Sequence, residues 1–83
     1  MYFVYILLMN NKKLYTGYTS NIKRRLNEHK RGANETTKKY LPIKLIFCEI
    51  FLNKKDAERR EKYFKTSKGK STIKLMLREY FQK

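Results

Sequence analysis

Several residue types that define whole classes of protein are scarce in this chain of 83 residues. Cys48 is the only cysteine, so no internal disulfide can form, and one cysteine with one histidine cannot complete a zinc cluster. No apolar run is long enough to span a bilayer. The apolar segment 2–9 is short and lacks the basic leader and the small-residue cleavage site of a signal peptide. A reduced, cytoplasmic setting is therefore expected.

Acidic residues are also few, 7 against 21 lysines and arginines, and the formal net charge is +14. An excess of this size favours a polyanionic partner. Nucleic acid is the first candidate, because neutralising phosphates releases counterions and drives binding. An anionic membrane surface is less favoured, since no helical segment combines a broad aliphatic face with a purely basic one. Lysine outnumbers arginine, so a lysine-biased composition, as in small proteins of AT-rich genomes, also explains the charge.

Two segments rich in β-branched and aromatic residues predict the strands of one hairpin. Residues 2–9 carry apolar side chains in both alternating sets, which indicates a central strand covered on both faces. Residues 13–18 are the predicted return strand, reached through the polar turn 10–13. Gly17 in that strand marks a bulge or a close approach of another group to the backbone.

Caps, breakers and apolar periodicity predict the other elements. The first is a helix capped by Thr19 or Ser20, which runs to about Arg31 and stops at Gly32, and a basic loop over 32–40 follows it. A third strand is predicted from Ile43 to Leu52, and after it a helix capped by Asn53 that runs to about Lys65. A break around Gly69 separates this helix from a last one that begins at about Ser71. The order β-β-α-β-α-α predicts an α+β fold with helices flanking a small three-stranded antiparallel sheet. Residues 1–83 are expected to form one domain. Cys48, on the third strand, is expected to be a small buried hydrophobe.

One carboxylate is out of place on the second predicted helix. Ala57, Glu61 and Phe64 have the spacing i, i+4 and i+7, so Glu61 lies in the middle of the inward stripe. A buried carboxylate is costly unless it is paired or bound to a cation. An i, i+4 pair with Lys65 and a site for a hard divalent ion such as Mg²⁺ explain Glu61 about equally well.

Four further residues suggest chemistry on phosphate when they are taken together. The hairpin can bring the phenols of Tyr5 and Tyr15 side by side, and Arg25 and His29 form an i, i+4 pair on the helix that follows. Taken singly, each has an ordinary explanation. Either tyrosine can be a strand residue that packs in the core, Arg25 can belong to a solvated basic face, and His29 can be a packing residue. The functional interpretation depends on the combination.

These segments resemble the GIY-YIG nuclease superfamily, and in particular its small stand-alone bacterial members related to the N-terminal nuclease domain of the excision-repair incision subunit. The resemblance covers nearly the whole chain, and five weak motifs in order make it specific. The five are the two tyrosine triplets, Arg25, His29 and Glu61. They lie within four strings of the sequence: Phe3-Val4-Tyr5, Tyr15-Thr16-Gly17-Tyr18-Thr19, Arg24-Arg25-Leu26-Asn27-Glu28-His29 and Asp56-Ala57-Glu58-Arg59-Arg60-Glu61-Lys62.

The resemblance implies roles for five residues. Tyr5 and Tyr15 match the tyrosines of the two triplets, Arg25 the helix arginine, His29 the histidine one turn later, and Glu61 the single metal-binding glutamate. It implies hydrolysis of DNA phosphodiesters with Mg²⁺ or Mn²⁺, in DNA repair or recombination. One phenol would act as, or relay to, the general base, Arg25 would steady charge on phosphoryl oxygens, and the ion would stabilise the leaving oxygen. Which phenol is the base is left open.

A nucleic-acid-binding module that keeps the fold and cuts little is the alternative interpretation, and it explains the charge equally well. RNA in place of DNA also stays open, because contacts to the backbone carry little sequence information. The sequence points to no protein partner or oligomeric state. Phosphate contacts are expected from nine basic residues: Lys23, Arg24, Lys30, Arg31, Lys38, Lys39, Lys65, Lys68 and Lys70.

Overall fold

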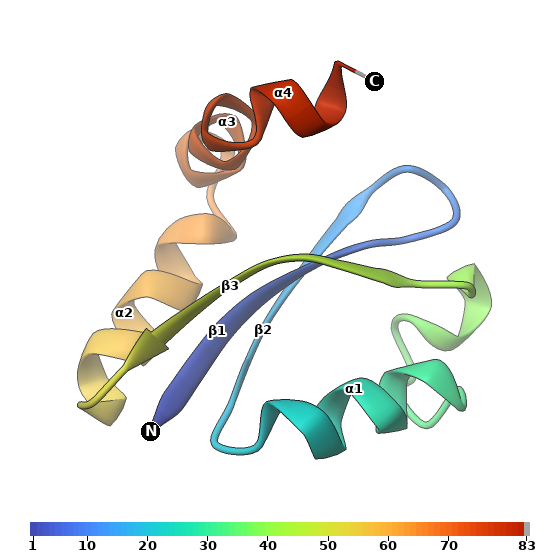
Figure 1. The fold of residues 1–83 in the computed structure, drawn as a ribbon, viewed down its shortest axis with the longest axis horizontal. Coiled ribbons are helices and arrows are strands. Elements are labelled where there is room, and N and C mark those ends of the chain that lie inside the picture. Colours follow the sequence, from blue (N-terminus) through green and yellow to red (C-terminus); the bar gives the residue numbers. More distant parts are fainter. Residues whose placement is uncertain (83) are drawn as a thin grey trace.

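A computed structural model describes residues 1–82 and contains one three-stranded antiparallel sheet. Its strands are β1 (Tyr2–Leu8), β2 (Leu14–Thr19) and β3 (Lys44–Phe51), in the order β2-β1-β3 (Figure 1). The prediction that the first strand is central is therefore confirmed. The α+β fold class and the order of the main elements are confirmed as well.

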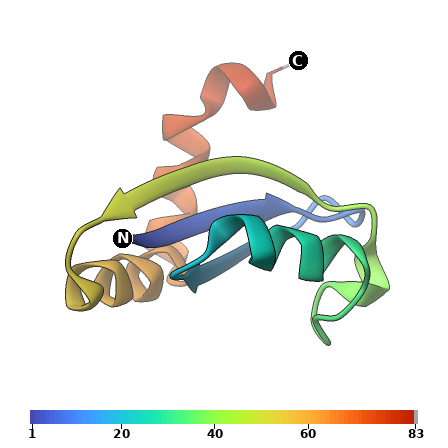
Figure 2. The same ribbon diagram turned by 60° about the horizontal axis from the view of Figure 1, so that its bottom comes forward.

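The alternating side chains of β1 build a separate core on each face of the sheet. Val4 and Ile6 pack with residues of α2 (Lys54–Phe64) and α3 (Ser67–Met76). Tyr5 and Leu7 pack with residues of α1 (Ile22–Lys30). Figure 2 shows α1 and α2 on either side of the strands. The sheet is thus covered by helices on both faces, as the apolar pattern of β1 requires.

The cap of α1 differs from the predicted one. Asn21, and not Thr19 or Ser20, is the N-cap, and its side-chain oxygen accepts a hydrogen bond of 3.0 Å from the backbone N–H of Arg24. The Thr19 hydroxyl accepts from the Asn21 N–H at 3.1 Å, so it orders the turn that leads into the helix. Asparagine is among the strongest N-cap residues, which explains the shift. The helix ends as predicted, with Gly32 at a φ of +78°.

The predicted break around Gly69 is wrong, because Gly69 lies inside α3. Asn53 caps α2 as expected, and Thr66 caps α3 by accepting from the Gly69 N–H at 3.0 Å. A Cβ at Gly69 would overlap the backbone of Tyr63 and Phe64. The glycine thus lets the start of α3 pass close to the end of α2. A short α4 (Arg78–Phe81) follows, and no helix within residues 1–82 is long and apolar enough to cross a membrane.

Cys48 is exposed, so the expectation of a small buried hydrophobe is wrong. It lies on β3, which is an edge strand, and pairs with Tyr5 on the sheet face that packs with α1. Helix α1 covers β1 on that face but leaves β3 open, and Leu45 and Ile50 of β3 are exposed as well, at 39% and 57%. An apolar composition therefore did not ensure burial on this strand.

Candidate active site

Tyr5 and His29 form a buried hydrogen bond across the core between β1 and α1. The Tyr5 hydroxyl lies 2.9 Å from Nε2 of His29. The tyrosine is 1% exposed and the histidine is 0% exposed. Burial raises the pKa of Tyr5 well above its usual value, and Tyr15 adds to this rise. Burial also lowers the pKa of His29, and the charge of Arg25 lowers it further, so the imidazole is held neutral.

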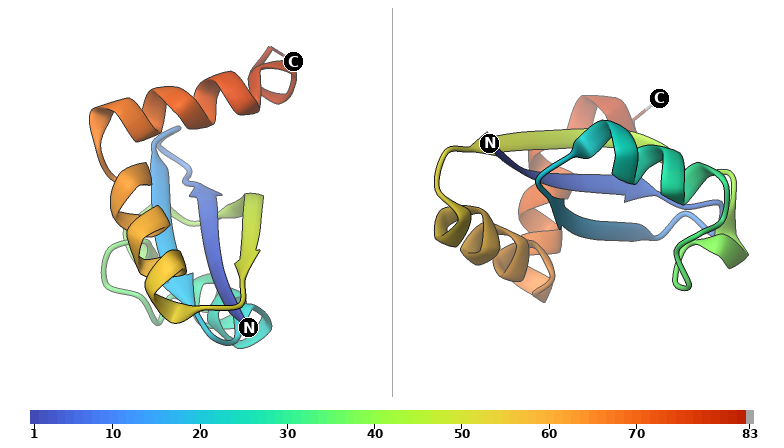
Figure 3. Two further views of the ribbon diagram at one scale, coloured as in Figure 1. Left: turned by 90° about the vertical axis from the view of Figure 1, so that its left-hand side faces the viewer. Right: turned by 90° about the horizontal axis from the view of Figure 1, so that it is seen from below.

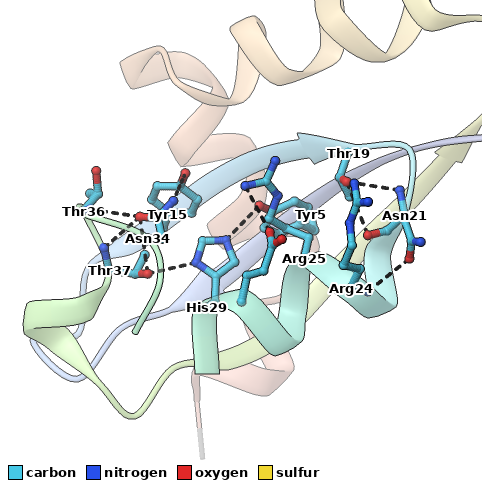
Figure 4. A network of polar contacts seen from close by, with 11 residues as sticks. Tyr5, Tyr15, Thr19, Asn21, Arg24, Arg25, His29, Asn34, Thr36 and Thr37 are labelled. Carbon is cyan, nitrogen blue, oxygen red and sulfur yellow. Dashed lines mark hydrogen bonds and ion pairs between the residues drawn. The ribbon is translucent and has the colours of Figure 1, made fainter. Parts of the chain in front are cut away.

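The loop after α1 continues this network to the second phenol (Figure 4). Nδ1 of His29 lies 2.8 Å from the hydroxyl of Thr37, which is fully buried. The Thr37 hydroxyl donates to Oδ1 of Asn34 at 3.4 Å, and Nδ2 of Asn34 donates to the Tyr15 hydroxyl at 3.4 Å. The rings of Tyr5 and Tyr15 also lie close together, with centroids 6.5 Å apart. One chain of contacts thus joins the two phenols through His29, Thr37 and Asn34.

Arg25 lies beside both members of the Tyr5–His29 pair. Its side chain is 39% exposed and forms an ion pair of 3.5 Å with Glu28, three residues further along α1. The guanidinium lowers the pKa of Tyr5, in opposition to burial, and also lowers the pKa of His29. Arg25 is therefore near the phenol and the imidazole and still reachable from solvent, as an arginine that binds a phosphate must be.

Glu61 reaches the same region from α2, on the other side of the sheet. Its charge raises the pKa of Tyr5, so the two groups lie within electrostatic reach of each other. The Glu61 side chain is 22% exposed, and its carboxylate pairs with Lys65 at 3.1 Å. The i, i+4 pair that the spacing allows is thus present. The structure thus brings Tyr5, Tyr15, Arg25 and His29 together (Figure 4), while Glu61 acts on Tyr5 through its charge from the helix α2.

The donor groups of this site fit a divalent ion that keeps most of its water. Within residues 1–82 no three His, Cys, Asp or Glu side chains come together as a metal cage. Glu61 supplies one partly exposed carboxylate, and its described partner, Lys65, is itself 57% exposed. Mg²⁺ is commonly bound through one or two carboxylates, several waters and a substrate phosphate. Glu61 can hold such an ion by exchanging Lys65 for it.

A polar cavity of about 460 Å³ adjoins the network on the side of α1 and the following loop. Its walls combine positive side chains with the residues that hold Asn34 in place. The lining residues are Arg25, Glu28, Arg31, Ala33, Asn34, Glu35 and Thr36. The cavity thus connects Arg25 to a second arginine through an open, polar space.

All nine basic residues predicted to contact phosphate are exposed. Lys38 pairs with Glu35 at 3.1 Å and Lys65 pairs with Glu61. Arg31 lines the polar cavity, which brings it to the edge of the network. Whether these residues bind nucleic acid stays a prediction, but all nine lie on the surface, where a polyanion can reach them.

Asn34 and Thr37 are members of the network that sequence reasoning missed. Their segment lacks apolar periodicity and was expected to be an ordinary basic loop. Asn34 nevertheless carries a usable signal, because asparagine often accepts hydrogen bonds from backbone N–H groups two and three residues further on. Oδ1 of Asn34 does so here, accepting from Thr36 at 2.9 Å and from Thr37 at 3.0 Å.

Known proteins resemble this chain in sequence and in fold. A UPF0213 protein of Streptococcus agalactiae is 44% identical over 64 residues, which cover 76% of this chain and 73% of that protein. A UPF0213 protein of Limosilactobacillus reuteri is 39% identical over 79 residues, which cover 92% of this chain and 82% of that protein. The solution NMR structure of a UPF0213 protein from Bacillus halodurans matches with a TM-score of 0.60 and 30% identity, covering 92% of this chain and 85% of that chain.

The family of the GIY-YIG catalytic domain matches residues 1–74, which include all five predicted catalytic residues. Membership supports a nuclease-type function on nucleic acid, and nucleases of this family generally use divalent metal ions. The UPF0213 names of the relatives say nothing about reaction or substrate. By the match along its sequence, the chain belongs to the GIY-YIG family.

Proposed function

We propose that this chain is a metal-dependent endonuclease that hydrolyses phosphodiester bonds of DNA. The observation that carries the proposal is the buried hydrogen bond of 2.9 Å between Tyr5 and His29, with Arg25 and Glu61 in electrostatic reach of the phenol. A structural tyrosine needs none of these neighbours. Together they supply what phosphodiester hydrolysis requires, a proton acceptor, a cation for the phosphate and a carboxylate for a metal ion.

The proton transfer begins at Tyr5. The phenol gives its proton to Nε2 of His29, and the resulting phenolate takes a proton from the attacking water. The water oxygen bonds to phosphorus while the bond from phosphorus to the leaving oxygen breaks, and the leaving oxygen takes a proton from solvent. His29 then gives up to solvent the proton that it took from Tyr5, so both side chains return to their starting state. Tyr5 alone is a poor base at neutral pH. The phenolate–imidazolium pair has no net charge, however. The Arg25 guanidinium favours the phenolate and disfavours the imidazolium, so the pair depends mainly on the hydrogen bond between Tyr5 and His29.

Arg25 and Glu61 act on the phosphate. Arg25 binds the nonbridging oxygens, whose charge grows during the attack. Glu61 would hold Mg²⁺ or Mn²⁺, in place of its ion pair with Lys65. When bound, the ion acts as a Lewis acid that neutralises negative charge on the phosphate and the leaving oxygen. Tyr15, which is half-buried beside the network, faces the substrate with its hydroxyl.

Residues 1–83 act in this proposal as one nuclease domain, with DNA repair or recombination as the setting. The net charge of +14 supplies the nonspecific attraction to DNA. Arg31 and the polar cavity next to Arg25 extend the site along the substrate backbone. The other exposed lysines and arginines predicted from the sequence continue this contact.

The test is cleavage of a panel of single-stranded, duplex, flapped and branched DNA, together with RNA. Each substrate is incubated with Mg²⁺, Mn²⁺ or EDTA. Three variants remove single groups, Tyr5→Phe, Arg25→Ala and Glu61→Gln, and Glu58→Gln on the same helix is the matched control. We expect metal-dependent cutting of DNA by the parent and the control. Each of the three variants should lose about 100-fold or more in rate, as for removal of a general base or of a charge-stabilising donor.

Three outcomes would overturn the proposal, in whole or in one part. Tight, salt-sensitive binding without cutting of any substrate would favour the nucleic-acid-binding module. Cutting confined to RNA would replace the substrate class and keep the chemistry. Cutting that survives EDTA and Glu61→Gln would remove the metal from the mechanism.

A further inference from the structure

Two backbone amides fix the orientation of the Asn34 side chain. The N–H groups of Thr36 and Thr37 both point at one atom of Asn34, at 2.9 and 3.0 Å. An N–H group can only donate, so this atom must be the carbonyl oxygen Oδ1. The amide nitrogen Nδ2 is therefore the atom that faces the Tyr15 hydroxyl at 3.4 Å. The positions of two main-chain hydrogens thus determine which end of Asn34 meets the phenol.

The orientation of the Asn34 amide also determines which nitrogen of His29 carries the hydrogen. Since Oδ1 of Asn34 is an acceptor, the Thr37 hydroxyl donates its one hydrogen to it. The Thr37 oxygen then has only lone pairs to offer to His29 Nδ1, 2.8 Å away, so Nδ1 carries the hydrogen. A neutral imidazole protonated at Nδ1 has its lone pair on Nε2. This is the atom that the Tyr5 hydroxyl meets at 2.9 Å.

The opposite tautomer leaves a buried hydrogen without an acceptor. If Nε2 of His29 donated to the Tyr5 oxygen, the Tyr5 hydrogen would need another acceptor. Within residues 1–82, His29 is the hydrogen-bond partner that the Tyr5 hydroxyl has, and the tyrosine is 1% exposed. An unpaired buried hydroxyl is disfavoured. The geometry therefore selects one direction for every hydrogen bond of the network.

We propose that Thr37, oriented by Asn34, is a positioning residue that holds His29 in the Nδ1-protonated tautomer and so directs the Tyr5 proton to Nε2. The catalytic consequence rests on the proposed function, whereas the tautomer is a property of the folded chain. The direction of these hydrogen bonds also distinguishes the two phenols. Tyr5 donates to His29, while Tyr15 accepts from Asn34 and keeps its own hydrogen for a substrate oxygen.

The tautomer can be measured directly, because His29 is the only histidine and gives a single set of imidazole signals. Long-range ¹H–¹⁵N spectra are recorded at about pH 8, where the imidazole is neutral. Thr37→Val removes the hydroxyl at nearly constant shape, Thr37→Ser keeps it, and Thr36→Val is the control. Thr36 is exposed and contributes only its backbone N–H.

We expect ¹⁵N shifts of a protonated Nδ1 and an unprotonated Nε2 in the parent, in Thr37→Ser and in Thr36→Val. Thr37→Val should show exchange-averaged shifts that move toward the other tautomer. Circular dichroism verifies that each variant is folded. A parent spectrum with the proton on Nε2, or a folded Thr37→Val variant with the parental spectrum, would overturn the proposal.

The nuclease assay then tests the consequence for catalysis. Groups that orient a reacting side chain typically cost about 10–100-fold when removed, and we expect a loss of this order in kcat for Thr37→Val, with KM little changed. Thr37→Ser should restore the rate. If the parent cuts no substrate, the proposed function fails, but the NMR result still decides the tautomer. If the parent cuts and Thr37→Val cuts equally well, the positioning role fails alone.

A separate observation carries a second inference. Four lysines gather around a cleft of about 350 Å³ between the turn of the β1–β2 hairpin and α3. Lys12 and Lys13 come from the turn, Lys70 and Lys74 lie one helical turn apart on α3, and Met9 and Leu14 complete the lining. Figure 3 shows α3 passing across the turn end of the hairpin. Among residues 1–82, the side chains that line this cleft include no acidic one.

The lysines of this cleft lack counterions in the protein. Among residues 1–82, the lysines with an ion-pair partner are Lys38 and Lys65. Four unpaired ammonium groups around one cleft repel one another, and a phosphate chain would relieve that repulsion. We infer that the cleft binds the backbone of the nucleic acid outside the cleavage site. Three of its lysines, Lys12, Lys13 and Lys74, lie outside the surface predicted from the sequence.

The test compares two double variants that remove equal charge. Lys70→Ala with Lys74→Ala changes the cleft, and Lys54→Ala with Lys55→Ala changes an exposed part of α2. Binding to duplex DNA is measured by fluorescence anisotropy in EDTA, which separates binding from cutting. Each lost phosphate contact lowers the salt slope by about 0.9, so the cleft variant should lose about 1.8 and the control less than half of that.

Equal losses in the two double variants would overturn the inference, because the lysines would then act only through net charge. Binding of vesicles of phosphatidylserine and phosphatidylcholine is measured in parallel. A loss of vesicle binding in the cleft variant, with DNA binding unchanged, would assign the cleft to a membrane surface and overturn the nucleic-acid inference.

Discussion

Gly17 lies directly opposite Tyr5 in the ladder between β2 and β1, and the phenol ring of Tyr5 fills the space that a side chain at Gly17 would occupy. A Cβ placed on Gly17 would overlap the end of that ring, including its hydroxyl. The glycine therefore lets the ring lie flat across the neighbouring strand, where its hydroxyl reaches His29. Gly17, which belongs to the second triplet of the family motif, thus makes room for Tyr5, the tyrosine of the first triplet.

Gly17→Ala is expected to lower the free energy of unfolding by about 1–3 kcal/mol, as for an overpacked core. The added methyl group displaces the Tyr5 hydroxyl from His29, so nuclease activity should fall as well. Urea denaturation measures the first effect. In a Tyr5→Phe background the hydroxyl is gone, and the alanine should then cost less. Equal costs in the two backgrounds would mean that the Tyr5 hydroxyl is not what the added methyl group displaces.

The buried neutral state of His29 predicts how stability depends on pH. Its pKa is lowered from the ordinary 6.5 by burial and by Arg25, while Glu28 opposes the shift. The unfolded chain therefore binds this proton at a higher pH than the folded chain does. Stability should be greatest above about pH 6.5 and fall as pH drops toward the lowered pKa, by at most about 1.4 kcal/mol per pH unit.

The measurement is urea denaturation between about pH 7.5 and 5.5, which stays above the range where Asp and Glu titrate. His29→Gln removes the titrating group and should flatten the profile in this window. The parent and the variant would have parallel profiles if His29 were protonated in the fold.

Arg60 joins α2 to the edge strand. Its guanidinium donates to both carboxylate oxygens of Glu49, at 2.8 and 3.1 Å, and lies 4.2 Å from the ring centroid of Phe64. Arg60→Ala should lower the free energy of unfolding by about 1.5–3 kcal/mol, because it removes a bidentate charged bond and a cation–π contact. Arg59→Ala on the same helix is the control. Its pair with Asp56 is well exposed, and such pairs are worth about 0–1 kcal/mol.

Lys39 tests the predicted nucleic-acid surface near the network. It is exposed and lies in the short helix η1 (Lys38–Tyr40). Lys39→Ala should weaken binding uniformly across DNA sequences and lower the salt slope by about one, because a phosphate contact carries no sequence information. Binding isotherms at several salt concentrations on unrelated duplexes measure both quantities. A loss confined to one sequence would indicate a base contact instead.

The sequence predicts the sheet well because the sheet depends on hydrophobic patterning. The two apolar faces of the first strand identify it as central, and the caps at Asn53 and Gly32 place two helix ends correctly. Gly69 was misjudged for a physical reason. A glycine that breaks a helix and a glycine that admits a neighbouring backbone look alike in one sequence, since only the tertiary contact distinguishes them.

Four predicted catalytic residues come together around His29, but the residues that orient them could not be found by periodicity. Thr37 is buried because its hydroxyl is satisfied by His29 and Asn34, not because it is apolar. Apolar periodicity does not detect polar side chains that are buried in this way. Cys48 shows the converse case, in which an apolar strand pattern predicts burial on a strand that the helix leaves uncovered.

The hydrogen-bond network around His29 also determines where residues can be inserted into this chain without disturbing the site. Glu35, Thr36 and Leu52 are all exposed, and exposed loop positions are the usual choice for a tag or a label. An insertion between Glu35 and Thr36 would pull apart Asn34 and Thr37, and with them the hydrogen-bond order around His29. The same insertion after Leu52, which is 86% exposed, leaves that order untouched. Two equally accessible loops therefore differ completely as attachment points, because only one of them is followed by a buried threonine, Thr37, that bonds to His29.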